Sequence, residues 1–202
     1  MDPLAIRAKF GDDYWSTERT HRLGIDVRIT RMVAQRFAGR SVFESCTGAG
    51  FTTISLARTA RHVVSAEIEP EHQALARRNL ERAGVLDRVT LIVGDCLSDA
   101  VACRVGQIDC AFLDPDWAVS GPDHVFRFRG SNMRPPADML LHRVLNWTPD
   151  IAMILPPTID LRELRDLPDH ELQYIYLDHI HALHCLYFGA LATAFGRSEM
   201  YA

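Results

Sequence analysis

The feature that most constrains the fold is a repeated switch of hydrophobic periodicity along residues 25–167. Short runs rich in β-branched residues alternate with segments whose apolar residues recur every three or four positions. Such alternation is typical of strands joined by helical crossovers, which form a parallel sheet covered on both faces. The expected strands are residues 41–46, 62–67, 88–93, 108–114 and 151–155, and the expected helices are residues 25–37, 52–59, 71–83, 97–102, 137–145 and 161–167. The sequence therefore predicts a doubly wound α/β domain.

The carboxyl-terminal part of the chain has a different pattern. Two extended runs, residues 171–179 and 182–188, follow each other closely enough to form an antiparallel hairpin at the edge of the sheet. With this hairpin the mostly parallel sheet has seven strands. We expect a short helical extension on the substrate side at residues 1–24, followed by one domain over residues 25–202.

Composition narrows the class of protein. The chain has 202 residues, of which 48% are hydrophobic, so it can bury one substantial core. It shows no signal-peptide pattern and no membrane-spanning run, and its five cysteines form no C-x-x-C pair. We therefore expect a soluble cytoplasmic protein with reduced cysteines. A net charge of −4 disfavours extended DNA or RNA binding but leaves room for a nucleotide or one exposed base.

Ligand-type residues follow the first two predicted strands. Glu44 is followed by Gly48-Ala-Gly50, a Gly-x-Gly turn that opens a helix, and ligands bind an open α/β sheet at this end of its strands. A plain turn explains the glycines equally well. Glu67 closes the second strand 17 residues after Gly50, close to the spacing at which a carboxylate accepts ribose hydroxyls. The candidate cofactor-binding residues are Glu44, Cys46, Thr47, Gly48, Ala49, Gly50, Glu67, Ile68, Asp95, Cys96 and Asp114.

Carboxylates also end the third and fourth predicted strands. Asp95 is suited to accept from an exocyclic adenine amine, although it also suits a helix N-cap. The fourth strand runs into Asp114-Pro115-Asp116-Trp117. The Asp114 carboxylate and the Pro115 carbonyl can each accept one N–H of a planar amine, while an indole stacks on the ring that carries the amine. We therefore take Asp114, Pro115, Asp116 and Trp117 as candidate catalytic residues.

Together these strand ends resemble a known family. Glu44 with Gly48-x-Gly50, Glu67, Gly94-Asp95 and Asp114-Pro115 are similar to the Rossmann-like class I S-adenosylmethionine-dependent methyltransferases. Trp117 followed by Gly121-Pro122-Asp123, with Ile154-Leu155-Pro156 and Tyr187-Phe188-Gly189, resembles more narrowly the trimethylguanosine synthase family, the RNA cap guanine-N2 methyltransferases. The likeness covers most of residues 14–190. Asp116 replaces the second proline of the family's pattern, and the following loop is longer.

The resemblance implies an N-methyltransferase that uses S-adenosyl-L-methionine as its cofactor. Its expected acceptor is an exocyclic amine, most readily guanine N2 of an RNA or nucleotide. Asp114 and Pro115 would accept the amine protons, and Asp116 would accept from guanine N1–H or take the released proton. Trp117, Asp123, Arg127 and Arg129 are the expected substrate-binding residues, the two arginines for phosphate or a cationic base.

Alternatives remain open. A short, acidic chain also suits a methyltransferase that acts on a small-molecule amine. The third alternative is a partner subunit that binds S-adenosylmethionine without catalysis. The presence of Asp114-Pro115 and Trp117, which would hold an amine, argues against it. The Asp178–Cys185 stretch holds three histidines, but alternation puts His184 on the face opposite His181 in a regular strand. We expect no metal there, and a structural role in an edge strand.

Overall fold

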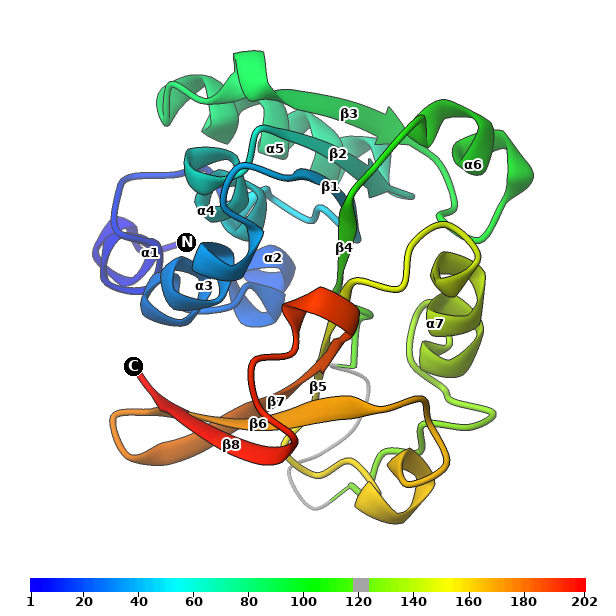
Figure 1. The fold of residues 1–202 in the computed structure, drawn as a ribbon. Helices are drawn as coiled ribbons and strands as arrows, with labels where there is room; N and C mark the ends of the chain where they lie inside the picture. The colour runs from blue at the N-terminus through cyan, green and yellow to red at the C-terminus, as the bar shows by residue number, and fades with distance from the viewer. Residues whose placement is uncertain (118–123) are drawn as a thin grey trace. The chain divides into compact units, whose positions relative to one another are not determined.

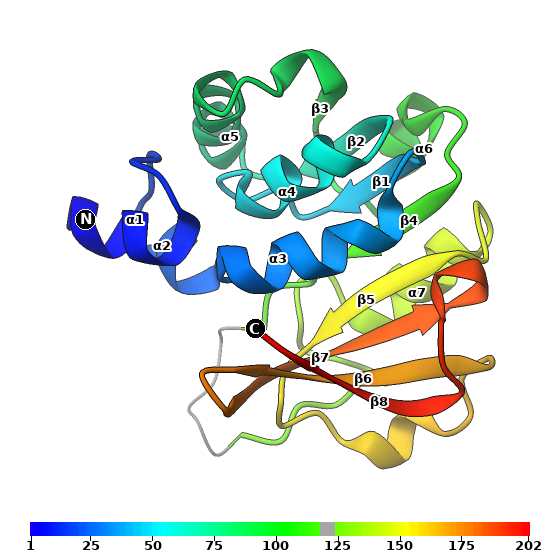
Figure 2. The same ribbon diagram turned by 60° about the vertical axis from the view of Figure 1, so that its left-hand side comes forward.

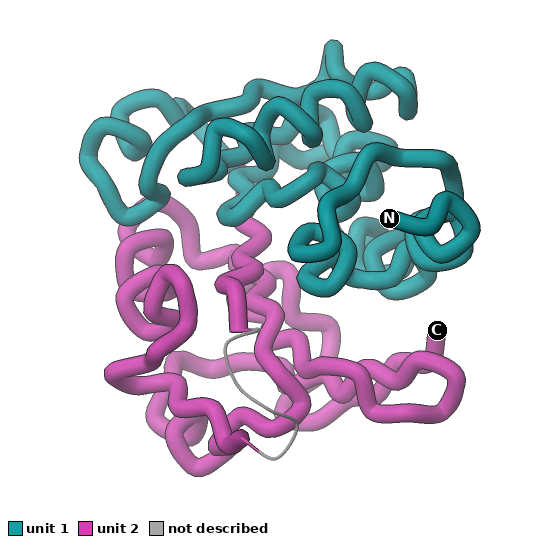
Figure 3. Tube along the Cα trace, turned by 180° about the vertical axis from the view of Figure 1, so that it is seen from behind, with its two compact units in different colours: residues 1–108 teal, residues 109–202 magenta. Residues whose placement is uncertain are grey.

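The computed structural model describes residues 1–117 and 124–202, and Figures 1 and 2 show its helices and strands as ribbons. These residues form two compact units, Met1–Ile108 and Asp109–Ala202, coloured separately in Figure 3. Gly121, Pro122 and Asp123 lie outside the described residues, so the structure does not bear on their predicted roles. In the described part of the chain, every helix is too short or too polar to cross a bilayer.

Unit 1 begins with three short helices, each started by a side-chain cap. Asp2 accepts from the Leu4 N–H at 3.0 Å, Thr17 forms a capping box with Thr20, and Asp26 accepts from the Arg28 N–H at 2.9 Å. The helices are α1 (Pro3–Phe10), α2 (Glu18–Leu23) and α3 (Val27–Ala34), and α3 continues as the 3-10 turn η1 (Gln35–Phe37). The predicted helical character of the amino-terminal extension is confirmed.

The rest of unit 1 is a three-stranded parallel sheet in the order β3-β2-β1 with its crossover helices. Its elements are β1 (Ser41–Ser45), α4 (Phe51–Thr59), β2 (His62–Glu67), α5 (Pro70–Arg82), η2 (Leu86–Arg88), β3 (Val89–Val93) and α6 (Asp99–Val105). Helix α3 packs against α4, and α5 packs on β2 and β3. The register pairs Ser45 with Ala66 and Glu67 with Val93, so the carboxyl ends of the three strands lie at one edge.

The amino-terminal helices pack directly on the sheet unit. Phe10 at the end of α1 stacks on Phe51 at the start of α4, with ring centroids 3.6 Å apart. Gly24 lies against both rings, because a Cβ atom there would come within 2.8 Å of each. Residues 1–24 are therefore part of the same packed unit as β1, β2 and β3.

Unit 2 contains five strands among its described residues, in the order β4-β5-β7-β6-β8. Strands β4 and β5 are parallel, as are β6 and β8, whereas β7 runs antiparallel to both β5 and β6. Helix α7 packs against β4 and β5. The elements are β4 (Cys110–Leu113), α7 (Ala137–Leu145), β5 (Ile151–Leu155), η3 (Leu161–Leu164), β6 (His170–Leu177), β7 (Ile180–Phe188), η4 (Gly189–Leu191) and β8 (Gly196–Tyr201).

The fold class and most of the predicted elements are confirmed, with three corrections. Strands β2 and β5 and helix α7 have the predicted bounds, and β6 and β7 form the predicted hairpin, which lies inside the sheet and not at its edge. The described residues contain eight strands and not seven, because β8 pairs with β6 and lies at the sheet edge. Strand β8 is mostly polar and exposed, so periodicity gives no signal for it. The helix predicted over residues 161–167 is only a 3-10 turn, η3.

Candidate functional site

The loop of residues 46–50, called here the glycine loop, connects β1 to α4 by a tight turn. Cys46, Gly48 and Gly50 all have positive φ, at 59°, 54° and 82°. Gly50 also lies close to α5, because a Cβ atom there would be 3.1 Å from the Ala76 Cβ atom. Both conditions require glycine at this position. At Gly48, by contrast, a Cβ atom would meet nothing within 4 Å among the described residues.

The structure brings the predicted carboxylate of β2 to this loop. Glu67 is 6% exposed, and its Oε2 atom accepts from the Gly48 N–H at 2.7 Å. Its Oε1 atom accepts from the Glu69 N–H at 3.0 Å. Each oxygen keeps a second lone pair, so the carboxylate can accept further hydrogen bonds. The glycine loop and Glu67, two of the predicted cofactor-binding features, therefore lie side by side at the ends of β1 and β2.

A buried hydroxyl network supports the other predicted carboxylate, Glu44. The Oε2 atom of Glu44 accepts from the Thr53 and Ser65 hydroxyls, each at 2.6 Å, and the Thr47 hydroxyl lies 2.6 Å from that of Ser65. Burial raises the pKa of Glu44 to about 7, and the nearby charge of Glu67 adds to the rise. Sequence reasoning missed Ser65 and Thr53, and Thr53 stands in the region where a dinucleotide fingerprint would have its third glycine.

The end of β3 presents a carboxylate of the predicted type in an exposed turn. The Asp95 Oδ1 atom accepts from the Leu97 N–H at 2.9 Å, and the cap of α6 is Ser98, which accepts from the Val101 N–H at 3.2 Å. Asp95 is therefore not the N-cap of α6. Cys96 is buried, whereas Ile68, after the end of β2, is 61% exposed.

Unit 2 carries the predicted acceptor-side residues at the end of β4. Pro115 is buried, and Asp114, Asp116 and Trp117 are half-buried. The Asp116 N–H donates to the Arg134 carbonyl at 2.9 Å, and the Arg134 N–H donates to the Asp116 carbonyl at 3.0 Å. This bridge joins the residue before Trp117 to Arg134. Asp114 belongs to a different unit from the other predicted cofactor-binding residues, all of which lie in unit 1.

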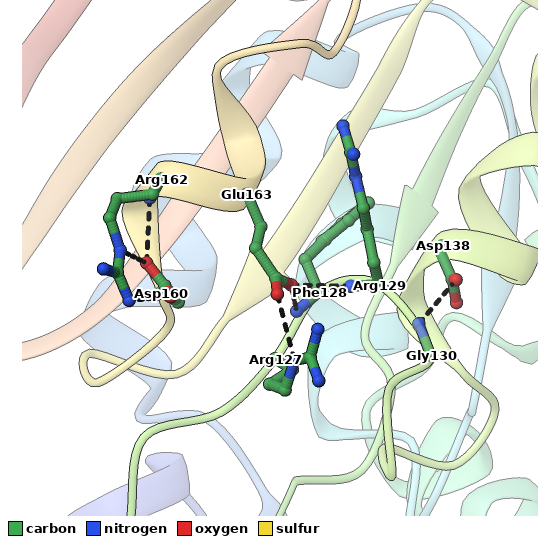
Figure 4. Close-up of polar contacts among 8 residues, drawn as sticks. All are labelled: Arg127, Phe128, Arg129, Gly130, Asp138, Asp160, Arg162 and Glu163. Carbon is green, nitrogen blue, oxygen red and sulfur yellow. Dashed lines mark hydrogen bonds and ion pairs between the residues drawn. The ribbon is translucent and has the colours of Figure 1, made fainter.

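The two arginines predicted to bind substrate are paired with carboxylates of η3 and the residues after it. The Arg127 Nε atom lies 3.0 Å from Glu163, and an Arg129 guanidinium nitrogen lies 3.0 Å from Asp166. Figure 4 shows that Glu163 also points to the main chain, where its Oε2 atom accepts from the Phe128 and Arg129 N–H groups, each at 2.8 Å. These hydrogen bonds lower the pKa of Glu163. Glu163 thus anchors the backbone of Phe128 and Arg129. Sequence reasoning missed it, because no local pattern links Phe128 to a residue 35 positions away.

The histidine-rich stretch departs from its predicted arrangement. His181 and His184 lie together, with ring centroids 4.4 Å apart, and both rings contact Tyr174. The register of the β6–β7 pair shifts between Ile175 and Tyr176, so simple alternation does not hold there. Burial lowers the pKa of His184 to about 4, with the neighbouring His181 adding to the effect.

The fold has a counterpart among solved structures, and the sequence matches a family model. The solved structure of a Porphyromonas gingivalis W83 protein assigned as a methyltransferase has this fold, with a TM-score of 0.74 and 17% identity over 91% of this chain and 47% of that one. The family model of RNA cap guanine-N2 methyltransferases matches residues 39–186, and the chain belongs to that family.

Two curated proteins are similar in sequence. Trimethylguanosine synthase of Schizosaccharomyces pombe is 28% identical over 158 residues, which cover 75% of this chain and 65% of that protein. Catechol O-methyltransferase of Mycobacterium tuberculosis is 42% identical over 88 residues, which cover 42% of this chain and 40% of that protein. The chain spans less than two thirds of each of these relatives.

Proposed function

We propose that the protein is an S-adenosylmethionine-dependent methyltransferase that acts on an exocyclic amine, with guanine N2 of an RNA or nucleotide as its acceptor. The observation that carries the proposal is the match of residues 39–186 to the family model, and the Gly48–Glu67 hydrogen bond of 2.7 Å between the glycine loop and the end of β2 supports the methyl-donor part of it. The Asp114-Pro115-Asp116-Trp117 sequence after β4 supports the same conclusion.

The residues of unit 1 fit the proposed donor. The space in front of Gly48, where a Cβ atom would meet no described residue, leaves the backbone of the loop accessible. Glu67 retains lone pairs for ribose hydroxyls, Asp95 retains an oxygen for an adenine amine, and Ile68 offers an exposed apolar contact. S-adenosylmethionine supplies a methyl group activated by its sulfonium. The chain itself then has to orient the reactants and exclude water.

The acceptor-side residues would bind and polarise the amine. In the proposed arrangement the Asp114 carboxylate and the Pro115 carbonyl accept the two amine protons, and Trp117 stacks on the purine. Accepting these protons raises the electron density on nitrogen and stabilises the positive charge that develops there. Asp116 would accept the guanine N1–H or the released proton. Proline has no N–H, so the turn offers acceptors and not donors at this point.

One observation favours a second candidate, methylation of a small molecule. Arg127 and Arg129, the cations expected to hold phosphate, are paired with Glu163 and Asp166. Neutralised arginines attract a phosphate chain less strongly than free ones. The similarity to a catechol O-methyltransferase points in the same direction.

Incubation with methyl-labelled S-adenosylmethionine and separate pools of RNA, guanine nucleotides and small-molecule amines or catechols tests the proposal. Label at guanine N2 in RNA or nucleotides supports it, and label only in other small molecules supports the second candidate. Donor binding without transfer to any pool would indicate a non-catalytic partner subunit. The Trp117→Ala variant, run in parallel, controls for a contaminating enzyme.

A further inference from the structure

A buried asparagine on α5 holds two separate backbone segments of unit 1. Asn79 is fully buried, and its amide nitrogen donates to the Trp15 carbonyl at 2.9 Å and to the Ala49 carbonyl at 2.8 Å. Its Oδ1 atom accepts from the Trp15 N–H at 2.8 Å. One side chain thus satisfies both backbone polar groups of Trp15 and the carbonyl of a glycine-loop residue.

A second contact fixes the same loop from the same helix. Ala76 lies one turn before Asn79, so the two residues share one face of α5. The Ala76 Cβ atom would be 3.1 Å from a Cβ atom at Gly50, so the helix and the loop lie too close for a side chain at Gly50 to fit without a shift. The close packing of Ala76 against Gly50 and the hydrogen bond from Asn79 to the Ala49 carbonyl together position residues 49 and 50.

The amino-terminal segment is held against α5 by more than this amide. The Arg78 guanidinium lies over the Trp15 ring, 4.2 Å from its centroid, and Arg82 forms an ion pair with Asp12 at 2.8 Å. Asp12 and Trp15 are therefore both held by side chains of α5. Any movement of this segment acts on the glycine loop through Asn79.

The chemistry of the position indicates a role beyond packing. A buried amide in a helix is costly unless its hydrogen bonds are made, and an apolar residue in its place would leave backbone groups of Trp15 and Ala49 without their partners. At Asn79 three hydrogen bonds are made, all to the main chain of other segments. The amide is suited to fixing the positions of those two segments with respect to each other.

We propose that Asn79 is a positioning residue that couples order in the amino-terminal segment, residues 12–16, to the conformation of the glycine loop. The inference rests on the proposed function, in which this loop binds the methyl donor. Coupling between two sites is reciprocal, so donor binding should protect the amino-terminal segment and loss of the coupling should weaken donor binding.

Hydrogen exchange of the Trp15 amide, with and without S-adenosylmethionine, tests the coupling in three variants. Asn79→Ala removes all three hydrogen bonds, and Asn79→Asp keeps an acceptor for the Trp15 N–H but loses the amide donor to the Trp15 and Ala49 carbonyls. Leu80→Ala, at a fully buried neighbour on the same helix, is the control for general destabilisation.

In the parent chain, the donor should slow exchange at Trp15 as well as in the glycine loop. Asn79→Ala should speed exchange at both places without ligand and weaken donor binding about tenfold. Asn79→Asp should keep slow exchange at Trp15 yet lose its response to the donor. Leu80→Ala should lower the melting temperature while keeping that response.

If the parent binds S-adenosylmethionine, either of two results would overturn the inference: parent-like donor affinity in Asn79→Asp with its Trp15 response intact, or equal loss of the response in Leu80→Ala. Failure of the parent to bind S-adenosylmethionine would instead refute the proposed function. Exchange of the ligand-free Asn79→Ala variant then still decides the coupling, because faster exchange at Trp15 with an unchanged glycine loop would overturn it.

Discussion

Replacing Glu44 by glutamine should stabilise the protein at pH 8 and change its stability little at pH 5. Glu44 is 1% exposed, its hydrogen bonds come from two hydroxyls, and no cationic group of the described residues pairs with it. Burial raises the pKa of Glu44 from 4.5 to about 7, so between these values the folded protein binds a proton that the unfolded chain releases. Stability is therefore lost as the pH rises through this range. The difference between the folded and unfolded pKa of Glu44 lowers the free energy of unfolding by about 3 kcal/mol above pH 7.

Glutamine has the shape of glutamate and stays neutral at every pH, so the variant escapes this loss. Urea unfolding of both proteins at pH 5 and pH 8 measures the difference in unfolding free energy as a shift in the urea midpoint at constant dependence on urea concentration. The expected gain is about 3 kcal/mol at pH 8 and less than about 1 kcal/mol at pH 5. Glu71→Gln, at an exposed position in the first turn of α5, is the control and should show no such change with pH. An equal midpoint for parent and Glu44→Gln at pH 8 would refute the reasoning.

Four further substitutions test other parts of the structure. Glu67→Ala should weaken S-adenosylmethionine binding by about 1–3 kcal/mol through lost charge-assisted hydrogen bonds, and an unchanged affinity in titration calorimetry would remove Glu67 from the donor site. Trp117→Ala should keep donor affinity but abolish turnover; turnover at the parent rate contradicts the stacking role. His184→Phe should reduce the loss in free energy of unfolding that the parent shows as the pH falls from 6.5 to 4. Burial holds the pKa of His184 at about 4, below its usual 6.5, so up to about 3 kcal/mol present above pH 6.5 is lost as the pH falls to 4. An equally large loss in the variant would contradict this explanation. Glu163→Ala leaves two backbone N–H groups without their acceptor and should lower stability by about 1–3 kcal/mol, whereas the exposed Asp166→Ala should change it by less than about 0.5 kcal/mol; equal urea midpoints for the two variants would count against the anchoring role.

The course of the chain could largely be predicted from the sequence, because its signals are local. Periodicity marks β2, β5 and α7 at their observed bounds, since a buried strand or a one-sided helix needs a regular apolar pattern. The edge strand β8 was missed for the same reason, because an exposed strand with few buried side chains carries no such pattern. Close contact between His181 and His184 was missed because it depends on a register shift in the β6–β7 pair.

By itself, the sequence determined the fold class and the types of residue at the strand ends, including the glycine turn, Glu67 and the Asp114–Trp117 turn. Only the tertiary structure decided which groups these residues contact. Glu44 meets the hydroxyls of Thr53 and Ser65, and Asn79 joins Trp15 to Ala49 across 64 and 30 residues. The reason is physical: backbone periodicity is fixed by neighbours in the chain, whereas burial, pKa and hydrogen-bond partners arise only when distant segments pack together.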